Sequence, residues 1–220
     1  MDNPSKIIEG GVEYSLGKFD GKSVVYDFPK ILDYLNVKGK LLFGEKFRIY
    51  NEDRRILMQL CSYFIKDKKN CDAYEIDINK GILLSGPVGC GKTSLMKLLR
   101  YIVPFQRPYE MIPCRNVAFG FNHLGFKTIE DYGNTKFYCF DDLGVEPAGR
   151  FYGKDLNVMG EVLLSRYDLY LNTKHKIKTH ATTNLNAQEL EDRYGNRVRS
   201  RMRELFNLIA FDERAGDKRK

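Results

Sequence analysis

Apolar and polar positions follow two different patterns along this chain, and the pattern changes near residue 51. Up to residue 50 it is mixed, with glycine-containing turns at EGG and FDGKS, a short helix predicted from Pro29, and the run GKLLFGEKFRIY. From residue 51 a helical spacing predicts one apolar helix face, formed by Ile56, Leu57, Leu60, Cys61 and Phe64. We therefore divide the chain into an N-terminal extension of unknown role, residues 1–50, and a main domain, residues 51–220.

Beyond this helix, strand-like apolar runs alternate with helical patterns. The strand-like runs are GILLS, EMIPCR, KFYCF, IKTHATT and NLIAF. Helices are predicted from Lys92, through VMGEVLLSRYDLYL, and through the arginine-rich segment that starts at Asn186. Such alternation is typical of an α/β protein whose parallel sheet is covered by helices on both faces.

A glycine-rich segment directly after GILLS carries the strongest motif of the chain. The sequence GPVGCGKTS fits the phosphate-binding pattern G-x-x-x-x-G-K-[ST], and its predicted nucleotide-binding residues are Gly86, Pro87, Val88, Gly89, Cys90, Gly91, Lys92, Thr93 and Ser94. Glycines let backbone N–H groups turn towards the phosphates, and the start of the following helix adds partial positive charge. Lys92 is expected to reach the β- and γ-phosphates, and Thr93 to bind Mg²⁺. The expected cofactors are therefore ATP and Mg²⁺.

A pair of carboxylates ends the strand-like run KFYCF. Asp141 and Asp142, in DDLG, are predicted at the carboxyl end of a strand, where ligands of open α/β sheets bind. Asp141 is expected to hold Mg²⁺ through water, and Asp142 to polarise the attacking water. Because DDLG departs from the commoner Asp-Glu pair, Glu146 is a rival for the water-activating role.

A polar tip ends another strand-like run, IKTHATT, at Thr182, Thr183 and Asn184. A TTN sequence is by itself a turn signal. At the end of a central strand it instead offers a hydrogen bond to the attacking water or the γ-phosphate. Asn184 is the candidate for this role.

Four arginines stand at every second position in YGNRVRSRMRE: Arg197, Arg199, Arg201 and Arg203. Asn186 and Glu189 have the spacing of a capping box, and the apolar residues that follow have helical spacing, so we predict a helix. On it the arginines form two pairs at positions i and i+4, one on each side of the apolar stripe. They form either a solvated basic face or, in one position, a catalytic arginine.

Size, charge and cysteine content add limits. The chain has 220 residues, a mass of 25.6 kDa, a net charge of +7 and a pI near 9.0, which is compatible with polyanion binding without requiring it. Five cysteines, an odd number without a C-x-x-C pair, suggest neither a disulfide framework nor a zinc site. No apolar run approaches membrane-spanning length and the N-terminus lacks the pattern of a secretion signal, so we expect a cytoplasmic protein.

Basic and aromatic residues predicted in or near the loops that follow strands are candidates for contact with DNA. The basic ones are Arg115, Lys127 and Arg150, and the aromatic ones are Phe121 and Phe126, which fit either stacking on bases or packing in the core. No helix-turn-helix spacing and no RNP-like motif occurs. Any binding should therefore follow phosphate electrostatics, with strong salt dependence and little sequence preference.

Taken in order, GPVGCGKTS, FDDLG, TTN and YGNRVRSRMRE resemble the AAA+ ATPases of the DnaC helicase-loader and IstB transposition-ATPase group, over roughly residues 50–211. The resemblance implies a P-loop NTPase fold with a five-stranded parallel sheet, an active site shared between neighbouring subunits, and work on DNA-bound machinery. It assigns Lys92 and Thr93 to Walker A, Asp141 and Asp142 to Walker B, Asn184 to sensor one, and Arg201 to the arginine finger.

Two segments depart from the larger members of this group. Only a short tail follows NLIAF, so we expect no full helical lid domain, and Arg219 in GDKRK resembles the short C-terminal sensor segment of helicase loaders. A frayed basic tail is the alternative for Arg219. Residues 1–50 resemble nothing that the motifs identify.

The leading functional hypothesis is an oligomeric, DNA-associated ATP hydrolase that loads or remodels a replicative helicase, with single- or double-stranded DNA as a partner. An ATPase partner of a transposase is a close alternative. A protein-remodelling ATPase that uses no nucleic acid is a different class. A small-molecule kinase is disfavoured, because DDLG and the polar strand tip favour hydrolysis.

Overall fold

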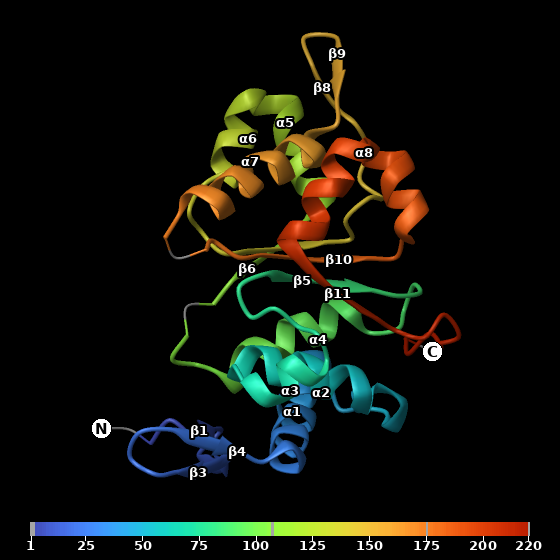
Figure 1. Ribbon diagram of the computed structural model, residues 1–220. Helices are drawn as coiled ribbons and strands as arrows, with labels where there is room; N and C mark the ends of the chain where they lie inside the picture. Colours follow the sequence, from blue (N-terminus) through green and yellow to red (C-terminus); the bar gives the residue numbers. More distant parts are fainter. Residues whose placement is uncertain (1–2, 107, 175, 220) are drawn as a thin grey trace. The chain divides into compact units, whose positions relative to one another are not determined.

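The computed structural model describes residues 3–106, 108–174 and 176–219 (Figure 1). The chain forms two compact units. Unit 1 comprises Met1–Ile76 and Ser94–Arg107, and unit 2 comprises Asp77–Thr93 and Pro108–Lys220. The chain changes unit after Ile76, after Thr93 and after Arg107, and the second of these points falls inside helix α4 (Lys92–Leu99), between the last two residues of GPVGCGKTS. Our division at residue 50 into an extension and an ATPase domain stays a prediction.

A five-stranded parallel sheet is the centre of unit 2, with the strand order β11–β5–β10–β7–β6. Its strands are β5 (Gly81–Ser85), β6 (Glu110–Pro113), β7 (Tyr138–Asp141), β10 (Thr179–Thr183) and β11 (Phe206–Ala210). Each of the five strand-like runs of the sequence therefore contributes a strand. The predicted α/β class with a five-stranded parallel sheet and helices is confirmed.

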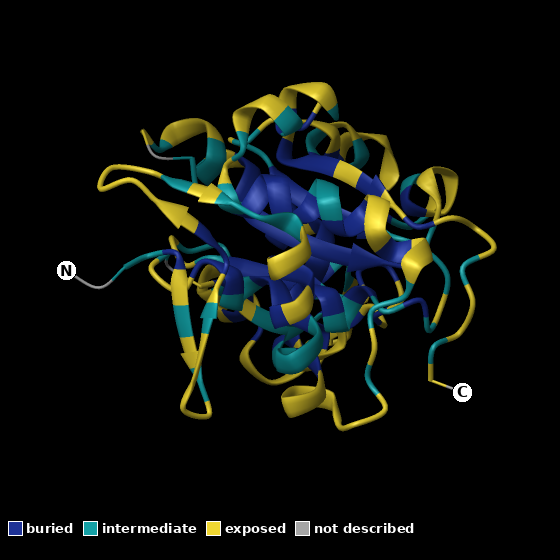
Figure 2. Ribbon diagram, turned by 90° about the horizontal axis from the view of Figure 1, so that it is seen from below, coloured by how far each residue is buried: buried dark blue, intermediate teal, exposed yellow. Residues whose placement is uncertain are grey.

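Four helices of unit 2 lie over one face of this sheet (Figure 1). They are α5 (Cys114–Leu124), α6 (Phe126–Tyr132), α7 (Val158–Asn172) and α8 (Ala187–Leu205). Their apolar sides form one core with the sheet, including Val117, Phe121, Phe140, Val162, Leu163, Val198 and Met202. Figure 2 shows how buried residues concentrate in the sheet strands and on the inner sides of the helices.

The central strand β10 is buried although its sequence, THATT, is polar. Each buried polar side chain has a partner: Thr179 Oγ1 accepts from Arg166 Nε at 2.6 Å, and His180 Nδ1 accepts from the backbone N–H of Ile82 at 3.1 Å. Burial lowers the pKa of His180 to about 3, so the ring is neutral and can accept this bond. Paired polar groups therefore let this strand occupy the centre of the sheet.

Helix α8 carries the four arginines, as predicted. Its capping box is formed: Asn186 Oδ1 accepts from the backbone N–H groups of Gln188 and Glu189, and the backbone N–H of Asn186 donates to Glu189 Oε2 at 2.7 Å. The helix is not continuous, because Gly195 adopts φ 77° and ψ 161°. A first segment thus ends at Tyr194, and the arginines lie on a second segment beyond the break.

Unit 1 contains two β-hairpins and several helices. The hairpin strands are β1 (Lys6–Glu9), β2 (Val12–Ser15), β3 (Gly17–Phe19) and β4 (Val24–Tyr26). The helical segments are α1 (Phe28–Phe43), η1 (Asn51–Asp53), α2 (Arg54–Ile65), α3 (Lys68–Ala73) and η2 (Arg100–Ile102). The apolar face predicted from residue 51 is buried on α2.

The short helix predicted from Pro29 is longer than expected. Helix α1 has 16 residues and continues through Gly39 to Phe43. Glycine is required at position 39, inside the helix, because a Cβ there would overlap the ring of Phe47. A glycine that signals a turn in the sequence is here a close packing contact.

Helices α5 and α6 and the hairpin of β8 (Gly149–Phe151) and β9 (Lys154–Leu156) were not predicted from the sequence. Gly125, with φ 58°, forms the corner between the two helices. Within the described parts of the chain, no helix is long and apolar enough to cross a bilayer.

Candidate nucleotide-binding and hydrolysis site

The glycine-rich loop follows β5 and leads into α4, at the carboxyl edge of the sheet. Gly86, Gly89 and Gly91 have φ values of 157°, 84° and 103°, which residues with a Cβ rarely adopt. At Gly86 a Cβ would lie 2.7 Å from Cβ of Phe211 and 3.1 Å from Sγ of Cys90. Glycine is therefore required both by the backbone conformation and by the packing of the loop.

Lys92 is tucked into this loop, and the residue is 6% exposed. Its Nζ donates to the carbonyl oxygens of Gly86 at 2.7 Å and Pro87 at 2.8 Å, and lies 3.9 Å from Sγ of Cys90. Burial lowers the pKa of Lys92, and the nearby Cys90 and Asp142 oppose this effect. The ammonium group is thus held where phosphates approach in a loop of this kind.

Hydroxyl groups connect the loop to the carboxylates. Asp141 Oδ1 accepts from Thr93 Oγ1 at 2.8 Å and from Thr182 Oγ1 at 2.6 Å. Thr182 Oγ1 also accepts from the backbone N–H of Asp142 at 3.0 Å. Three elements, α4, β7 and β10, therefore meet at one carboxylate beside the phosphate loop, as the positions of Thr93 and Asp141 in the sequence predict.

Asp142 turns away from the strand with φ 57°. Burial raises the pKa of its carboxyl group, and the neighbouring Asp141 adds to this effect. The positive charges of Lys92, Arg115 and Arg219 act in the opposite direction. Asp142 therefore lies among the charged groups of the site, and its carboxyl group is harder to ionise than an ordinary one.

Asn184 follows the end of β10, next to the phosphate loop. The backbone N–H of Gly86 donates to the carbonyl of Thr183 at 3.2 Å, which ties the loop to this strand tip. Oδ1 of Asn184 is buried and has no hydrogen-bond partner among the residues described. An orphaned polar atom at this place is suited to a ligand or a water molecule.

Glu146 has a different environment from Asp142. Oε2 accepts from the backbone N–H of Gly144 at 2.8 Å, and Oε1 accepts from the hydroxyl of Tyr194 at 2.7 Å. Nη2 of Arg193 lies 3.6 Å from Oε1 and also donates to the backbone carbonyl of Glu146. Both carboxylate oxygens are engaged within the protein, so of the two rivals for activating water, the geometry favours Asp142.

The C-terminal tail lies against the phosphate loop. The backbone N–H of Lys218 donates to the carbonyl of Gly89 at 3.1 Å, and a Cβ at Gly89 would overlap the carboxylate of Asp217. Arg219 pairs with Asp217, with Nε 3.1 Å from Oδ1 and Nη2 3.2 Å from Oδ2. Asp217 raises the pKa of Arg219. Arg219 therefore lies near the site with its guanidinium held by its own tail.

Arg201 lies far from this loop within unit 2. Its Nη1 donates to Oε1 of Glu204 and to the hydroxyl of Tyr167, both at 3.3 Å, and its guanidinium lies 4.6 Å from the centre of the Tyr167 ring. Helix α8 ends where β11 begins, and β11 starts opposite Gly81 at the amino edge of the sheet. The Arg201 side chain is 40% exposed there.

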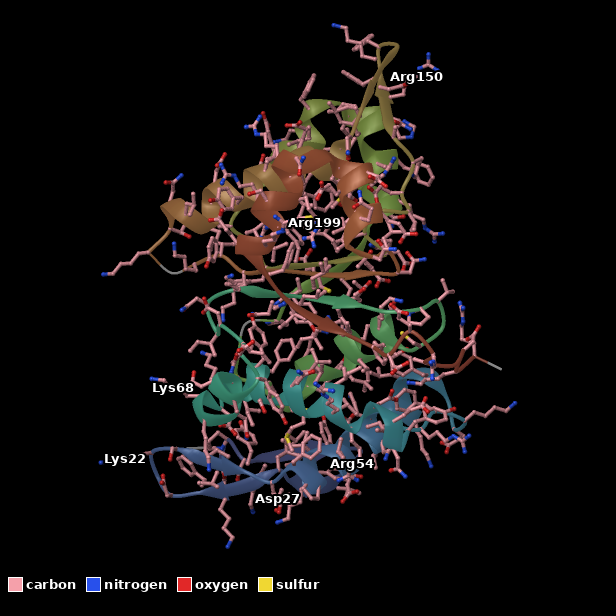
Figure 3. All side chains as sticks on the ribbon, turned by 45° about the vertical axis from the view of Figure 1, so that its right-hand side comes forward. Lys22, Asp27, Arg54, Lys68, Arg150 and Arg199 are labelled. Carbon is pink, nitrogen blue, oxygen red and sulfur yellow. The ribbon has the colours of Figure 1, made fainter. Side chains whose placement is uncertain are left out.

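The other arginines of the row differ in their surroundings. Arg197 is exposed, whereas Nη2 of Arg203 lies 3.9 Å from Oε2 of Glu191 on the first segment of α8. Nε of Arg199 is buried without a partner among the described residues, and burial lowers the pKa of this arginine (Figure 3). The row is thus not a uniform solvated face.

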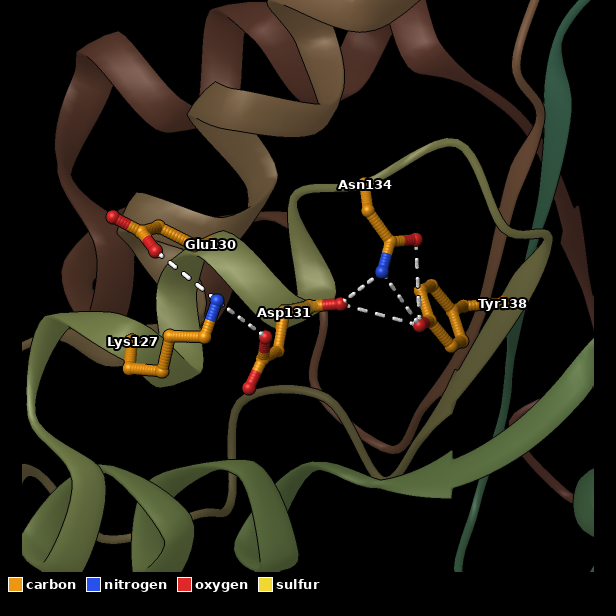
Figure 4. A network of polar contacts seen from close by, with 5 residues as sticks. All are labelled: Lys127, Glu130, Asp131, Asn134 and Tyr138. Atoms are coloured by element: carbon orange, nitrogen blue, oxygen red, sulfur yellow. Dashed lines mark hydrogen bonds and ion pairs between the residues drawn. The ribbon is translucent and has the colours of Figure 1, made fainter.

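The three basic candidates for DNA contact are all exposed, but they lie on helices and a hairpin rather than on loops. Arg115 is in the first turn of α5, and Lys127 is in α6, where it pairs with Glu130 at 3.3 Å and Asp131 at 3.1 Å (Figure 4). Arg150 is on β8, with Nε 3.7 Å from Oδ1 of Asp155 (Figure 3). The ion pairs of Lys127 leave it least suited to bind phosphate.

The two phenylalanines have opposite environments. Phe121 is 2% exposed in the core, whereas Phe126 is 65% exposed. Tyr152 was not selected from the sequence, yet it is 91% exposed at the tip of the β8–β9 hairpin with φ 48°. Only the two-residue Tyr-Gly turn between short strands signals this position.

No group of three or more histidine, cysteine, aspartate or glutamate side chains able to hold a metal ion occurs in the described ranges. A cation at this site would therefore be held by Thr93 and Asp141 jointly with nucleotide phosphates, in the usual manner of Mg²⁺. The glycine conformations and the orphaned Asn184 oxygen fit such a ligand.

Comparisons with known proteins support the fold. No family model and no curated protein matches the chain. Among solved structures, the crystal structure of the DnaC helicase loader is similar, with a TM-score of 0.53 and 18% sequence identity over 76% of this chain and 95% of that one. The parallel five-stranded sheet, the phosphate loop and this similarity together identify the fold of the chain as that of a P-loop NTPase.

Proposed function

We propose that this protein is a Mg²⁺-dependent ATP hydrolase of the AAA+ type. The observation that carries the proposal is the hydrogen-bonded group of Thr93, Asp141 and Thr182 beside the phosphate loop. It joins the Walker A helix, the Walker B strand and the sensor strand at the place where nucleotide and cation bind in this fold.

Each residue of the site has a role in this proposal. Lys92 leaves the loop carbonyls to bind the β- and γ-phosphates, and Thr93 and Asp141 hold the cation. When bound, Mg²⁺ neutralises the charge that develops on the phosphate oxygens. Asp142 accepts a hydrogen bond from the attacking water, which Asn184 orients through its unpaired oxygen.

Arg219 and Arg201 complete the proposed site from two directions. Arg219 exchanges its Asp217 partner for a phosphate oxygen of nucleotide bound to its own subunit. Arg201 is the arginine finger, and Arg197, one turn earlier, is the alternative. Because Arg201 lies towards the amino edge of its own sheet and the phosphate loop at the carboxyl edge, it serves the nucleotide of a neighbouring subunit. The proposal therefore requires an oligomer.

ATP turnover by the purified protein, with and without Mg²⁺, tests the enzymatic proposal. We expect Lys92→Ala to abolish ATP binding measured by the fluorescence of a labelled nucleotide. Lys136→Ala is the matched control, because Lys136 is an exposed lysine of unit 2, 3.7 Å from Glu110. ATP binding that is equal in the two variants would refute the phosphate assignment.

We further propose that the ATPase acts on DNA-bound machinery, as a loader or remodeller of a replicative helicase. This part rests on the resemblance of the motifs and on the exposed basic and aromatic residues of α5, α6 and the β8–β9 hairpin. Arg150 and Tyr152 supply a positive charge and a stacking surface at one tip. Capture of a helicase or of a transposase by the tagged protein distinguishes the loader from the IstB-like alternative.

DNA binding can be tested by fluorescence anisotropy at two salt concentrations on unrelated oligonucleotides. We expect affinity to fall steeply with salt, to depend little on sequence, and to weaken in Tyr152→Ala. Asp155→Ala is the matched control on the same hairpin, because it removes a negative charge and should leave binding equal or tighter. Absence of binding at low salt would favour a protein-remodelling ATPase.

A further inference from the structure

Glu146 lies between the loop that follows Asp142 and helix α8, which carries the four arginines, and its side chain is hydrogen-bonded to both. Its side chain is 2% exposed, a position that a carboxylate rarely occupies unless it is paired, as Glu146 is with Arg193. One oxygen accepts from the backbone N–H of Gly144 and the other from the hydroxyl of Tyr194. The contact to Tyr194 spans 48 residues of sequence, so it joins two segments that are otherwise remote along the chain.

The first connection fixes the loop that carries Asp142. Gly144 has φ 102°, and a Cβ there would overlap the side chain of Leu185, directly after Asn184. Leu143, between Asp142 and Gly144, donates its N–H to the carbonyl of Thr182 at 2.8 Å and accepts at its carbonyl from Thr183 Oγ1 at 2.7 Å. With Glu146 holding the N–H of Gly144, the whole turn after Asp142 is bonded in place.

The second connection fixes α8 at its break. Tyr194 is buried and directly precedes Gly195, where the helix leaves helical geometry. Burial and the nearby Glu146 raise the pKa of Tyr194 well above its ordinary value, so its hydroxyl remains a donor. The adjacent Arg193 is held as well, since its carbonyl accepts from Nδ2 of Asn157 at 2.9 Å.

We propose that Glu146 is a positioning residue that links the Asp142 loop to the hinge of α8, so that a nucleotide-dependent change at one is transmitted to the arginines beyond the other. This inference rests on the proposed ATPase function. It assigns Glu146 a role through Gly144 and Tyr194 rather than in direct contact with water. The two segments of α8 meet at Gly195, and the bond to Tyr194 determines where the second segment starts.

Tyr194→Phe is the sharpest test, because it removes the hydroxyl bonded to Glu146 and keeps the packed ring. Tyr138→Phe is the matched control: Tyr138 is also buried, and its hydroxyl donates to the carbonyl of Asp131 at 3.3 Å, in the separate network of Figure 4. We expect Tyr194→Phe to lower kcat by about tenfold, the rate equivalent of one hydrogen bond to a charged group, with the Kd for ATP unchanged. Tyr138→Phe should keep the wild-type kcat.

Hydrogen exchange supplies a readout that a purely structural role would not change. In the wild type, addition of ATP and Mg²⁺ should alter amide exchange across residues 193–203, and Tyr194→Phe should lose this response while still binding ATP. Glu146→Gln keeps the shape of the side chain but removes the charge facing Arg193. This variant should also lose the ATP-dependent change in amide exchange.

Two failures are distinguishable in this experiment. If the wild type neither binds nor hydrolyses ATP, the proposed function fails and this role fails with it. If the wild type is an active ATPase and Tyr194→Phe matches Tyr138→Phe in kcat and in ATP-dependent exchange, only the positioning role is overturned, and Glu146 serves stability alone.

Discussion

Thr182 is the residue through which Asp141 and Asp142 are bonded to the central strand, and replacing it by valine tests that arrangement. The residue is fully buried, and valine has nearly the same shape. The change removes the bond from Thr182 Oγ1 to Asp141 at 2.6 Å and the bond from the N–H of Asp142 to Thr182 Oγ1 at 3.0 Å. The valine side chain can neither donate to Asp141 nor accept from the N–H of Asp142.

The expected magnitude follows from these two bonds. A hydrogen bond to a charged carboxylate contributes about 1.5–3 kcal/mol, and a donor left without a partner costs about 1–3 kcal/mol when buried. The N–H of Asp142 is only partly buried, so its contribution belongs at the lower end. Together they predict a loss of about 2–4 kcal/mol in the free energy of unfolding, which is roughly 4–16 °C in Tm for a chain of this size.

Thermal unfolding without nucleotide measures this loss, and Thr128→Val is the matched control. Thr128 is also a buried threonine, 2% exposed, but its Oγ1 has no hydrogen-bond partner among the residues described. Removing that hydroxyl should leave Tm unchanged or raise it slightly, because burying an unpaired hydroxyl is unfavourable. Mg²⁺-dependent ATP affinity should also fall in Thr182→Val, by about tenfold if one such bond orients Asp141.

Equal Tm values for Thr182→Val and Thr128→Val would refute the reasoning, because the two variants lose the same atom from equally buried sites. A large fall in Tm with unchanged ATP affinity would separate the two claims. The hydroxyl would then stabilise the fold without orienting the carboxylate.

Three further predictions concern single groups of the site. Asp142→Asn should raise Tm at neutral pH, because the folded-state pKa of Asp142 is raised and its ionisation destabilises the fold as pH rises through that pKa. The gain in Tm should disappear below the ordinary carboxyl pKa near 4, as melting curves across pH will show. Asp217→Asn should tighten ATP binding about twofold to fivefold by releasing Arg219, and weaker binding in a nucleotide titration would mean that Asp217 instead orders the tail. Arg201→Ala should slow ATP hydrolysis by about 10³- to 10⁵-fold and leave ATP binding intact. Mixing this variant with Lys92→Ala protein should restore part of the activity. Wild-type turnover by Arg201→Ala alone would mean that Arg201 is ordinary surface charge.

The sheet and the phosphate loop were predictable because their signals are local. Each strand is a short apolar or β-branched run, and the glycines of the loop are required by conformations that their own positions impose. The start of α8 was equally clear, since the bonds between Asn186 and Glu189 lie within four residues. In these places the sequence spacing already determines the contacts.

Helices α5 and α6 were missed for the opposite reason. Their sequence carries Gly120 and Gly125, and large apolar residues at exposed positions, such as Phe119 at 50% and Phe126 at 65%, obscure the buried stripe. Gly125 forms the corner against the Phe151 ring, where a Cβ would lie 2.5 Å from Cε1 of that ring. This is a tertiary cause, which a local pattern cannot express.

The surroundings of Glu146 and Arg201 also depend on contacts across long stretches of chain. Glu146 is four residues beyond Asp142, and this closeness in sequence suggested a catalytic rival. Its carboxylate is instead bonded to Tyr194 of α8, 48 residues away. Arg201 likewise rests against Tyr167, 34 residues earlier, and this contact holds its side chain against α7.

In the proposed oligomer, the course of α8 connects the nucleotide site of its own subunit with that of a neighbour. It starts just after the Asn184 tip at the carboxyl edge and ends where β11 begins at the amino edge. A strand of five residues spans about 16 Å, so the two ends of the helix lie too far apart for one arginine to contact both sites. Under this proposal, a change at one site reaches the other along the helix. Since Gly195 departs from helical φ and ψ between the two segments, the first segment can direct the second only if its last turn is itself fixed. The bond between Tyr194 and Glu146 supplies that fixed point, on the loop that carries the proposed catalytic carboxylate.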